Sequence, residues 1–142
     1  MLGYVDASLD AEAFDEDDYY RTGDLGVIDE DGYVVITGRL KDVIIRTGEN
    51  VSAKEVEDLL FTHPDVADAA VIGVPDERTG ERVCALVVSV EGAEPTLDAI
   101  VTHLKAAGLR NQALPERLEL LDALPRNPAG KVLKRQLQAR YR

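Results

Sequence analysis

Residues 69–90 read AAVIGVPDERTGERVCALVVSV, and the fold follows from them. The first six residues and the run 82–90 are rich in β-branched and small apolar side chains, which favour β-strands. Residues 75–80, PDERTG, have the composition of a turn. We therefore predict two adjacent antiparallel strands at the centre of a sheet.

Helices are predicted on both sides of this pair in the sequence. Ser52 can cap a helix by accepting the amide of Glu55, whose carboxylate can reach back, and the apolar residues that follow lie on one stripe. Thr96 can cap a second helix, which Gly108 ends. We expect a short third strand at 118–121 and a final helix from Lys131 to about residue 141.

The N-terminal third reads as extended structure. Residues 25–37 predict a hairpin around Asp31-Gly32, a dipeptide that tolerates the positive φ of a tight turn. Residues 43–45 form another extended run, which reaches a turn at Thr47-Gly48. These elements predict an α+β fold from about residue 42 onward, with a three-stranded sheet, flanking helices and a short β-hairpin. Residues 1–38 have too few strands to bury a core alone.

Composition indicates one ordered domain with part of another. The chain has 142 residues, 45% of them apolar, and a formal charge of -11. Residues 1–31 carry eleven acidic residues against one arginine, whereas residues 32–142 carry sixteen acidic and fifteen basic residues. The acidity therefore belongs to the first fifth, which suggests a boundary, and no nucleic-acid-binding surface is indicated.

The cysteine and histidine content excludes several kinds of site. Cys84 is the single cysteine, so no internal disulfide forms, and its apolar surroundings favour a buried structural thiol. His63 and His103 are isolated in the sequence, which makes a zinc site improbable. Without a signal-peptide pattern or an apolar run long enough to span a bilayer, we expect a cytoplasmic protein with no transmembrane segment.

The decapeptide PRNPAGKVLK, residues 125–134, delivers a lysine at a fixed place. Two prolines and a glycine impose a loop, and Lys131 follows it near the start of the last helix. Residues 126–142 contain six Lys or Arg and no acidic residue, a local field suited to a phosphate or carboxylate. The alternative is an ordinary basic helix with a solvated face.

Three segments together resemble the adenylate-forming superfamily, which contains acyl-CoA synthetases, adenylation domains of nonribosomal peptide synthetases and luciferases. They are residues 20–25 (YRTGDL), residues 38–57 (GRLKDVIIRTGENVSAKEVE) and the Lys131 loop. The resemblance implies that Asp24 binds the ribose hydroxyls of the nucleotide and that Arg39 contacts the nucleotide. From the residues alone, Asp24 could be a turn aspartate, and Arg39 could form a surface ion pair with Asp42.

The same resemblance implies three further roles. Lys41 is the hinge between a large N-terminal domain and a small mobile C-terminal lid, although alone it reads as a solvent-facing strand residue. Thr47, Gly48 and Glu49 help to line the pantetheine channel of CoA, or form a hairpin turn and no more. Lys131 is the catalytic lysine that stabilises charge in the adenylation transition state.

The resemblance also implies what the chain does not contain. The acyl pocket, the adenine site and the Mg²⁺ ligands belong to the family's N-terminal domain, so we expect residues 1–38 to be its distal, β-rich end, residues 39–41 the hinge and residues 42–142 the lid. The implied parent is an acyl-CoA synthetase that uses a carboxylic or fatty acid, ATP and CoA, releases AMP, and is inactive as this fragment. The alternatives are the C-terminal part of a peptide-synthetase adenylation domain and a non-catalytic module that retains the fold.

Overall fold

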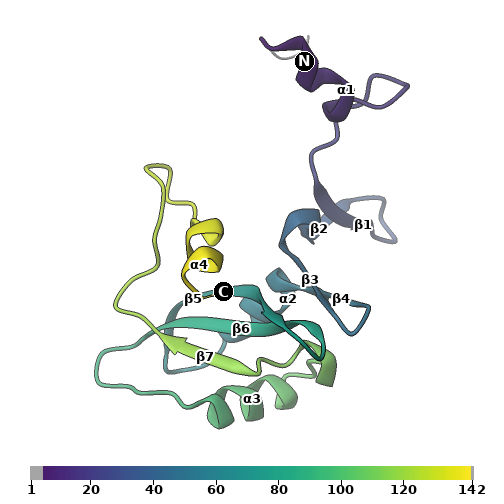
Figure 1. Ribbon diagram of the computed structural model, residues 1–142. Coiled ribbons are helices and arrows are strands. Elements are labelled where there is room, and N and C mark those ends of the chain that lie inside the picture. The colour runs from purple at the N-terminus through teal and green to yellow at the C-terminus, as the bar shows by residue number, and fades with distance from the viewer. Residues whose placement is uncertain (1–4, 142) are drawn as a thin grey trace. The chain divides into compact units, whose positions relative to one another are not determined.

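The computed structural model describes residues 5–141 (Figure 1). The chain divides into two compact units, Met1–Lys41 and Asp42–Arg142. Among the described residues, none of the helices has the length and hydropathy needed to cross a membrane.

The first unit contains a short helical segment and an antiparallel hairpin. A 3₁₀ turn, η1 (Ala7–Leu9), leads into α1 (Asp10–Ala13), and β1 (Asp24–Ile28) pairs with β2 (Val34–Arg39). The predicted hairpin is confirmed, but its turn is longer than a two-residue turn. The Asp29 side chain accepts the backbone N–H groups of Asp31 and Tyr33, and Gly32 alone takes a positive φ, of 85°.

The second unit is built around the strands predicted from residues 69–90. β5 (Val66–Asp76) and β6 (Gly80–Ser89) form a long antiparallel hairpin, and β7 (Arg117–Leu120) pairs with β6 in parallel. The preceding hairpin of β3 (Val43–Arg46) and β4 (Glu49–Ser52) joins the same sheet, because Arg46 pairs with Gly80. The three predicted strands are therefore part of a five-stranded sheet.

Alternate residues of β5 and β6 are buried on opposite faces of the sheet. One face packs against α2 (Ala53–Leu60) and α3 (Leu97–Ala106), and the other packs against α4 (Lys134–Tyr141), which Figure 1 shows on the opposite side of the sheet from α3. The first cluster includes Val71 and Val87, and the second includes Ile72 and Leu86. This layering confirms the predicted mixed α+β class.

Both predicted helix starts are confirmed by their caps. Ser52 Oγ accepts the N–H of Glu55 at 3.3 Å, and Thr96 Oγ1 accepts the N–H of Ala99 at 3.2 Å. Gly108 follows α3 with a φ of 89°, and a short 3₁₀ turn, η3 (Asn111–Ala113), precedes β7. These starts could be predicted because a cap is a contact between residues close in sequence.

The last helix begins later than predicted, at Lys134 rather than Lys131. Arg126 and Val132 form an isolated antiparallel bridge, and the Leu133 N–H donates to the Pro125 carbonyl at 2.8 Å. These backbone groups form hydrogen bonds within the loop. The first carbonyl that accepts helical hydrogen bonds is therefore that of Leu133. Lys131 consequently lies in the loop and not in the helix.

Candidate functional site

Asp24 and Arg39 are brought together in the first unit. Their Cα atoms are partners in the β1–β2 register, and Arg39 Nε lies 2.6 Å from Asp24 Oδ1. The Asp24 N–H donates to Thr22 Oγ1 at 3.0 Å, which fixes the start of the strand. The alternative pairing of Arg39 with Asp42 is therefore wrong, because the ion-pair partner is Asp24.

This ion pair leaves binding capacity on both side chains. Among residues 5–141, neither Asp24 nor Arg39 forms an ion pair with any other residue. The side chains of Arg39 and Asp24 are 39% and 24% exposed. A carboxylate oxygen can accept from a hydroxyl, and a guanidinium can donate to phosphate or ribose oxygens, so the pair offers both kinds of group at one place.

Lys41 lies in η2 (Leu40–Asp42), a 3₁₀ turn between β2 and β3. Its side chain is exposed, and the boundary between the two units falls directly after it. Lys41 is therefore in a turn. The prediction from the residues alone, a solvent-facing strand residue, is wrong about the strand.

Thr47, Gly48 and Glu49 form the tip of the β3–β4 hairpin. Thr47 and Gly48 are the two loop residues and have φ angles of 54° and 79°, the combination that a type I′ turn requires. A positive φ is unusual for a β-branched residue and carries strain. The Thr47 N–H donates to the Thr79 carbonyl at 2.8 Å, and Glu49 lies 3.9 Å from Arg110.

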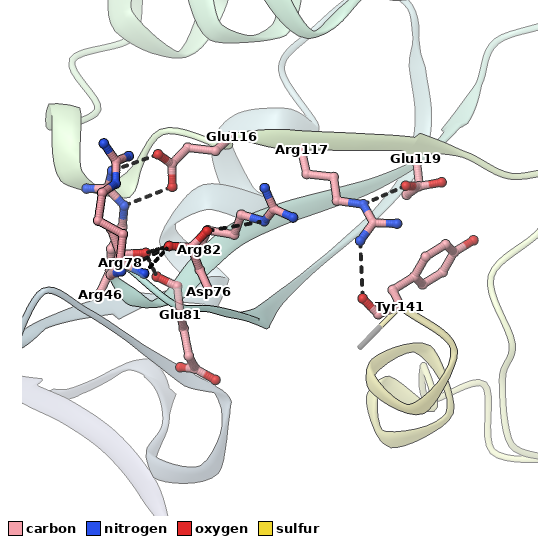
Figure 2. A network of polar contacts seen from close by, with 10 residues as sticks. Arg46, Asp76, Arg78, Glu81, Arg82, Glu116, Arg117, Glu119 and Tyr141 are labelled. Carbon is pink, nitrogen blue, oxygen red and sulfur yellow. Dashed lines mark hydrogen bonds and ion pairs between the residues drawn. The ribbon is translucent and has the colours of Figure 1, made fainter.

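Two carboxylates, of Glu116 and Glu81, hold this hairpin against the end of the sheet, and Figure 2 shows the contact of Glu116 with Arg46. Arg46 donates two hydrogen bonds to the Glu116 carboxylate, of 3.0 and 2.9 Å, and this contact raises the pKa of Arg46. The Glu81 carboxylate accepts the Ile45 N–H at 2.7 Å. Arg46 and Glu116 are 70 positions apart, so no local pattern in the sequence could have paired them.

The turn between β5 and β6, beside this hairpin, is also stabilised by a carboxylate. Asp76 Oδ1 accepts the Thr79 hydroxyl at 2.9 Å and the Thr79 N–H at 3.0 Å. These hydrogen bonds hold the pKa of Asp76 below its ordinary value. The contacts of Asp76 with Thr79 thereby fix the position of the Thr79 carbonyl, which accepts the hydrogen bond from the Thr47 N–H.

Lys131 is carried by a turn with a well-defined backbone. The Gly130 N–H donates to the Asn127 carbonyl at 2.8 Å, the Asn127 N–H donates to the Lys131 carbonyl at 2.9 Å, and the Lys131 N–H donates to Asn127 Oδ1 at 2.8 Å. Gly130 has a φ of 80°, which favours glycine there. The turn fixes the Lys131 backbone while its side chain is exposed.

The charges around Lys131 differ from the uniform basic field that the sequence suggests. Arg126 forms an ion pair with Asp68 at 2.6 Å, and Lys134 forms one with Glu57 at 2.7 Å. Lys131 makes no ion pair with any residue of 5–141. The flanking cations are neutralised by acidic residues from β5 and α2, and the Lys131 ammonium is left available for an external anion.

The Lys131 loop and the Thr47 turn are not brought together. The first is tied to Asp68, near the start of β5, and the second to the turn after Asp76, at the end of β5. Eight residues of extended strand separate these anchors, or about 26 Å. The second unit therefore carries two predicted functional segments at opposite ends of one strand.

Cys84 is buried in β6, and burial raises the pKa of its thiol to about 11. The rings of His63 and His103, far apart in sequence, meet edge to face with centroids 4.8 Å apart. Within the described part of the chain, no group of three or more His, Cys, Asp or Glu side chains could hold a metal ion.

Comparison with known proteins identifies the family. The AMP-binding enzyme C-terminal domain family matches residues 55–131, more than half of the chain. This chain belongs to that family. The predicted resemblance to the C-terminal part of adenylate-forming enzymes is thereby confirmed, and Lys131 is the last residue of the matched segment.

The names of individual relatives of this AMP-binding C-terminal domain give different acceptors for the acyl group, a carrier protein in one and CoA in another. The fatty acid–[acyl-carrier-protein] ligase ScoC of Streptomyces coeruleorubidus is 48% identical over 125 residues, 88% of this chain and 24% of ScoC. The medium-chain fatty-acid–CoA ligase of Escherichia coli strain K12 is 43% identical over 136 residues, 94% of this chain and 24% of the ligase. The chain thus spans about a quarter of the length of these relatives.

The fold of this AMP-binding C-terminal domain also has solved counterparts. The crystal structure of ATP-bound MatB from Rhodopseudomonas palustris matches with a TM-score of 0.86 and 41% identity, over 92% of this chain and 26% of MatB. At that identity and TM-score the likeness extends to both fold and family.

Proposed function

We propose that this chain is the C-terminal part of an ATP-dependent acid–thiol ligase, an acyl-CoA synthetase acting on a fatty or other carboxylic acid. In the parent reaction a carboxylate oxygen attacks the α-phosphorus of ATP, which gives an acyl-adenylate and pyrophosphate. The CoA thiol then attacks the acyl carbon and displaces AMP. The observation that carries the proposal is the exposed Lys131 on a fixed turn, without an ion-pair partner within residues 5–141.

Lys131 is proposed as the catalytic residue of adenylation. An ammonium placed beside the attacking carboxylate and the α-phosphate stabilises the negative charge that builds up in the transition state. This task requires a free cation at a fixed position, and a lysine already paired with a protein carboxylate would serve it poorly. Neutralisation of its neighbours Arg126 and Lys134 supports the role.

Asp24 and Arg39 are proposed to bind the nucleotide. The carboxylate of Asp24 suits the ribose hydroxyls, and the guanidinium of Arg39 suits ribose or phosphate oxygens. Their ion pair across β1 and β2 orients both side chains before the nucleotide arrives. The pair thus fits ATP and AMP as ligands.

The two ends of β5 are proposed to serve the two half-reactions. Rotation of the second unit about Lys41 would exchange the Lys131 loop for the Thr47-Gly48-Glu49 turn at the active site. The exposed position of Lys41 at the unit boundary and the separation of the two segments support this alternation. In the second orientation the hairpin tip would line the pantetheine channel.

The proposed parent is larger than this chain. We place residues 1–38 at the end of an N-terminal domain, residues 39–41 at the hinge and residues 42–142 in the lid, and we expect the acyl pocket, adenine site and Mg²⁺ ligands in that N-terminal domain. Magnesium would supply charge neutralisation on the ATP phosphates. The proposed parent works in the cytoplasm, and this chain alone is expected to be inactive.

Pyrophosphate exchange in the full-length parent, measured against a panel of carboxylic acids, tests the proposal. Acid-dependent exchange with fatty acids is expected, and a parent that exchanges with no acid would instead be a non-catalytic module. Release of AMP with CoA, compared with loading of a phosphopantetheinylated carrier protein, then tests the acceptor. The name of ScoC, a carrier-protein ligase, favours carrier-protein transfer as the second candidate, and that outcome would include a peptide-synthetase adenylation domain.

A further inference from the structure

Arg126 lies in the loop of Lys131 but is turned toward the sheet. We propose that Arg126 and Asp68 are positioning residues for Lys131, because the guanidinium ties the carbonyl before Lys131 to a carboxylate on β5. The inference deepens the proposed function and rests on the catalytic role proposed for Lys131. It assigns to Arg126 a task other than meeting the phosphate directly.

The bridge uses both terminal nitrogens of one guanidinium. Arg126 Nη1 donates to the Gly130 carbonyl at 2.6 Å, and Arg126 Nη2 donates to Asp68 Oδ2 at 2.6 Å. Gly130 immediately precedes Lys131, so the peptide plane that leads into the catalytic residue is fixed by this contact. A planar group with two parallel donors is needed to hold both acceptors at once.

The other end of the bridge is rigid. Asp68 lies in β5 opposite Val88 of β6, and its Oδ1 accepts the Ala69 N–H at 3.0 Å. The carboxylate is thus oriented by its own strand, and the strand belongs to the central hairpin of the sheet. Movement of the turn relative to the sheet would break the contact with Asp68.

The other hydrogen bonds of the turn do not reach the sheet, although Val132, next to Lys131, packs against the apolar cluster that includes Ile72 of β5. The bonds between Asn127 and Lys131 are internal, and the Leu133 N–H bond to Pro125 closes the neck of the loop. Of the hydrogen bonds and ion pairs within residues 5–141, the Arg126 bridge is the one that ties residues 127–131 to β5. Arg126 therefore supplies the polar part of the contact that orients the Lys131 turn relative to the sheet.

The effect of the Arg126–Asp68 ion pair on the position of Lys131 can be separated from its effect on folding stability. The side chains of Arg126 and Asp68 are 43% and 26% exposed, and ion pairs at such exposure contribute little to folding stability. A catalytic group displaced by about 1 Å, in contrast, can lose on the order of a hundredfold in rate. Loss of the bridge should therefore affect adenylation far more than folding.

A double-mutant cycle in the full-length parent tests this inference. Arg126→Ala and Asp68→Asn are each expected to slow acid-dependent pyrophosphate exchange on the order of tenfold, with the KM for ATP unchanged. In a Lys131→Ala background the same two substitutions are expected to have no further effect. Thioester formation from preformed acyl-adenylate should keep its rate.

Two variants serve as comparisons. Asp58→Asn makes the same charge change at an exposed ion pair with Lys54 in α2 and should leave exchange unchanged. Arg126→Lys keeps the charge but loses the two-nitrogen bridge, so it should be as slow as Arg126→Ala. Recovery of the rate by lysine would show that charge alone matters and would overturn the inference.

The remaining outcomes separate the inference from the function on which it rests. Normal exchange in Arg126→Ala, or an equal loss in the Lys131→Ala background, overturns the positioning role while Lys131→Ala is still impaired. Normal exchange in Lys131→Ala instead overturns the proposed catalytic role of Lys131 itself.

Discussion

Lys134 Nζ lies 2.7 Å from Glu57 Oε1, and the same oxygen accepts the N–H of Val71 at 2.7 Å. One carboxylate therefore joins α4, α2 and β5. The side chains of Lys134 and Glu57 are 19% and 17% exposed, so both charges are largely removed from water. Removal of either partner leaves the other poorly solvated.

Loss of this ion pair is expected to destabilise the chain. Lys134→Met should lower the free energy of unfolding by about 1–3 kcal/mol, because a hydrogen-bonded charge is left without its partner. Urea denaturation followed by circular dichroism measures the loss. The control is Lys54→Met, whose exposed ion pair with Asp58 should contribute less than about 1 kcal/mol. Equal losses in the two variants would contradict the structural role of Glu57.

Substitution of Asp24 is expected to weaken nucleotide binding. Asp24→Asn removes the charge that holds Arg39 and the acceptor proposed for the ribose, so the KM for ATP should rise about tenfold or more in the full-length parent. Pyrophosphate exchange at varied ATP concentration gives the value. Asp31→Asn, an exposed acidic residue in the same hairpin, is the matched control and should leave the KM unchanged. A common KM for both variants and the wild type would exclude Asp24 from the nucleotide site.

The turn at Thr47 stores strain that a substitution can release. Thr47→Asn should raise the free energy of unfolding by about 1 kcal/mol, because asparagine tolerates a positive φ better than a β-branched residue. Thermal denaturation compares it with Thr102→Asn, on the exposed side of α3, which should be nearly neutral. A destabilised Thr47→Asn variant would show that the threonine side chain is itself stabilising there.

Cys84 supplies a pH-dependent test of burial. Its pKa is raised from an ordinary value of 9.0 to about 11, so the folded state favours the protonated thiol. The stabilisation is complete below pH 9 and is lost as the pH rises toward 11. The difference in unfolding free energy between wild type and Cys84→Ala should therefore shrink over that range. Iodoacetamide should label the native chain slowly and the denatured chain rapidly, and rapid native labelling would contradict the buried position.

The sequence contained enough local information for most elements. The strands within residues 69–90 and the caps at Ser52 and Thr96 depend on neighbours within a few positions, so composition and spacing predicted them. The start of α4 was misplaced because the bridge between Arg126 and Val132 competes with helix formation. That competition depends on backbone geometry that a residue pattern does not specify.

Only part of the candidate site could be predicted from the sequence, for the same reason. Asp24, Arg39 and Lys131 were predicted from their motifs, but the partners Asp68 and Glu57 come from other elements and carry no local signal. From the sequence alone, all the Lys and Arg side chains of residues 126–142 were therefore expected to be available to bind an anion. The tertiary structure neutralises Arg126 and Lys134 and leaves Lys131 unpaired among the described residues.

Lys131→Ala in the full-length parent tests the proposed catalytic role of Lys131 most directly. Pyrophosphate exchange should fall about a hundredfold, on the order of 3 kcal/mol in barrier, because a preorganised charge contact to the transition state is lost. Conversion of preformed acyl-adenylate to thioester should continue at the wild-type rate. Arg135→Ala, an exposed basic residue at the start of α4, should change neither rate. Exchange at the wild-type rate in Lys131→Ala would contradict the catalytic role of Lys131.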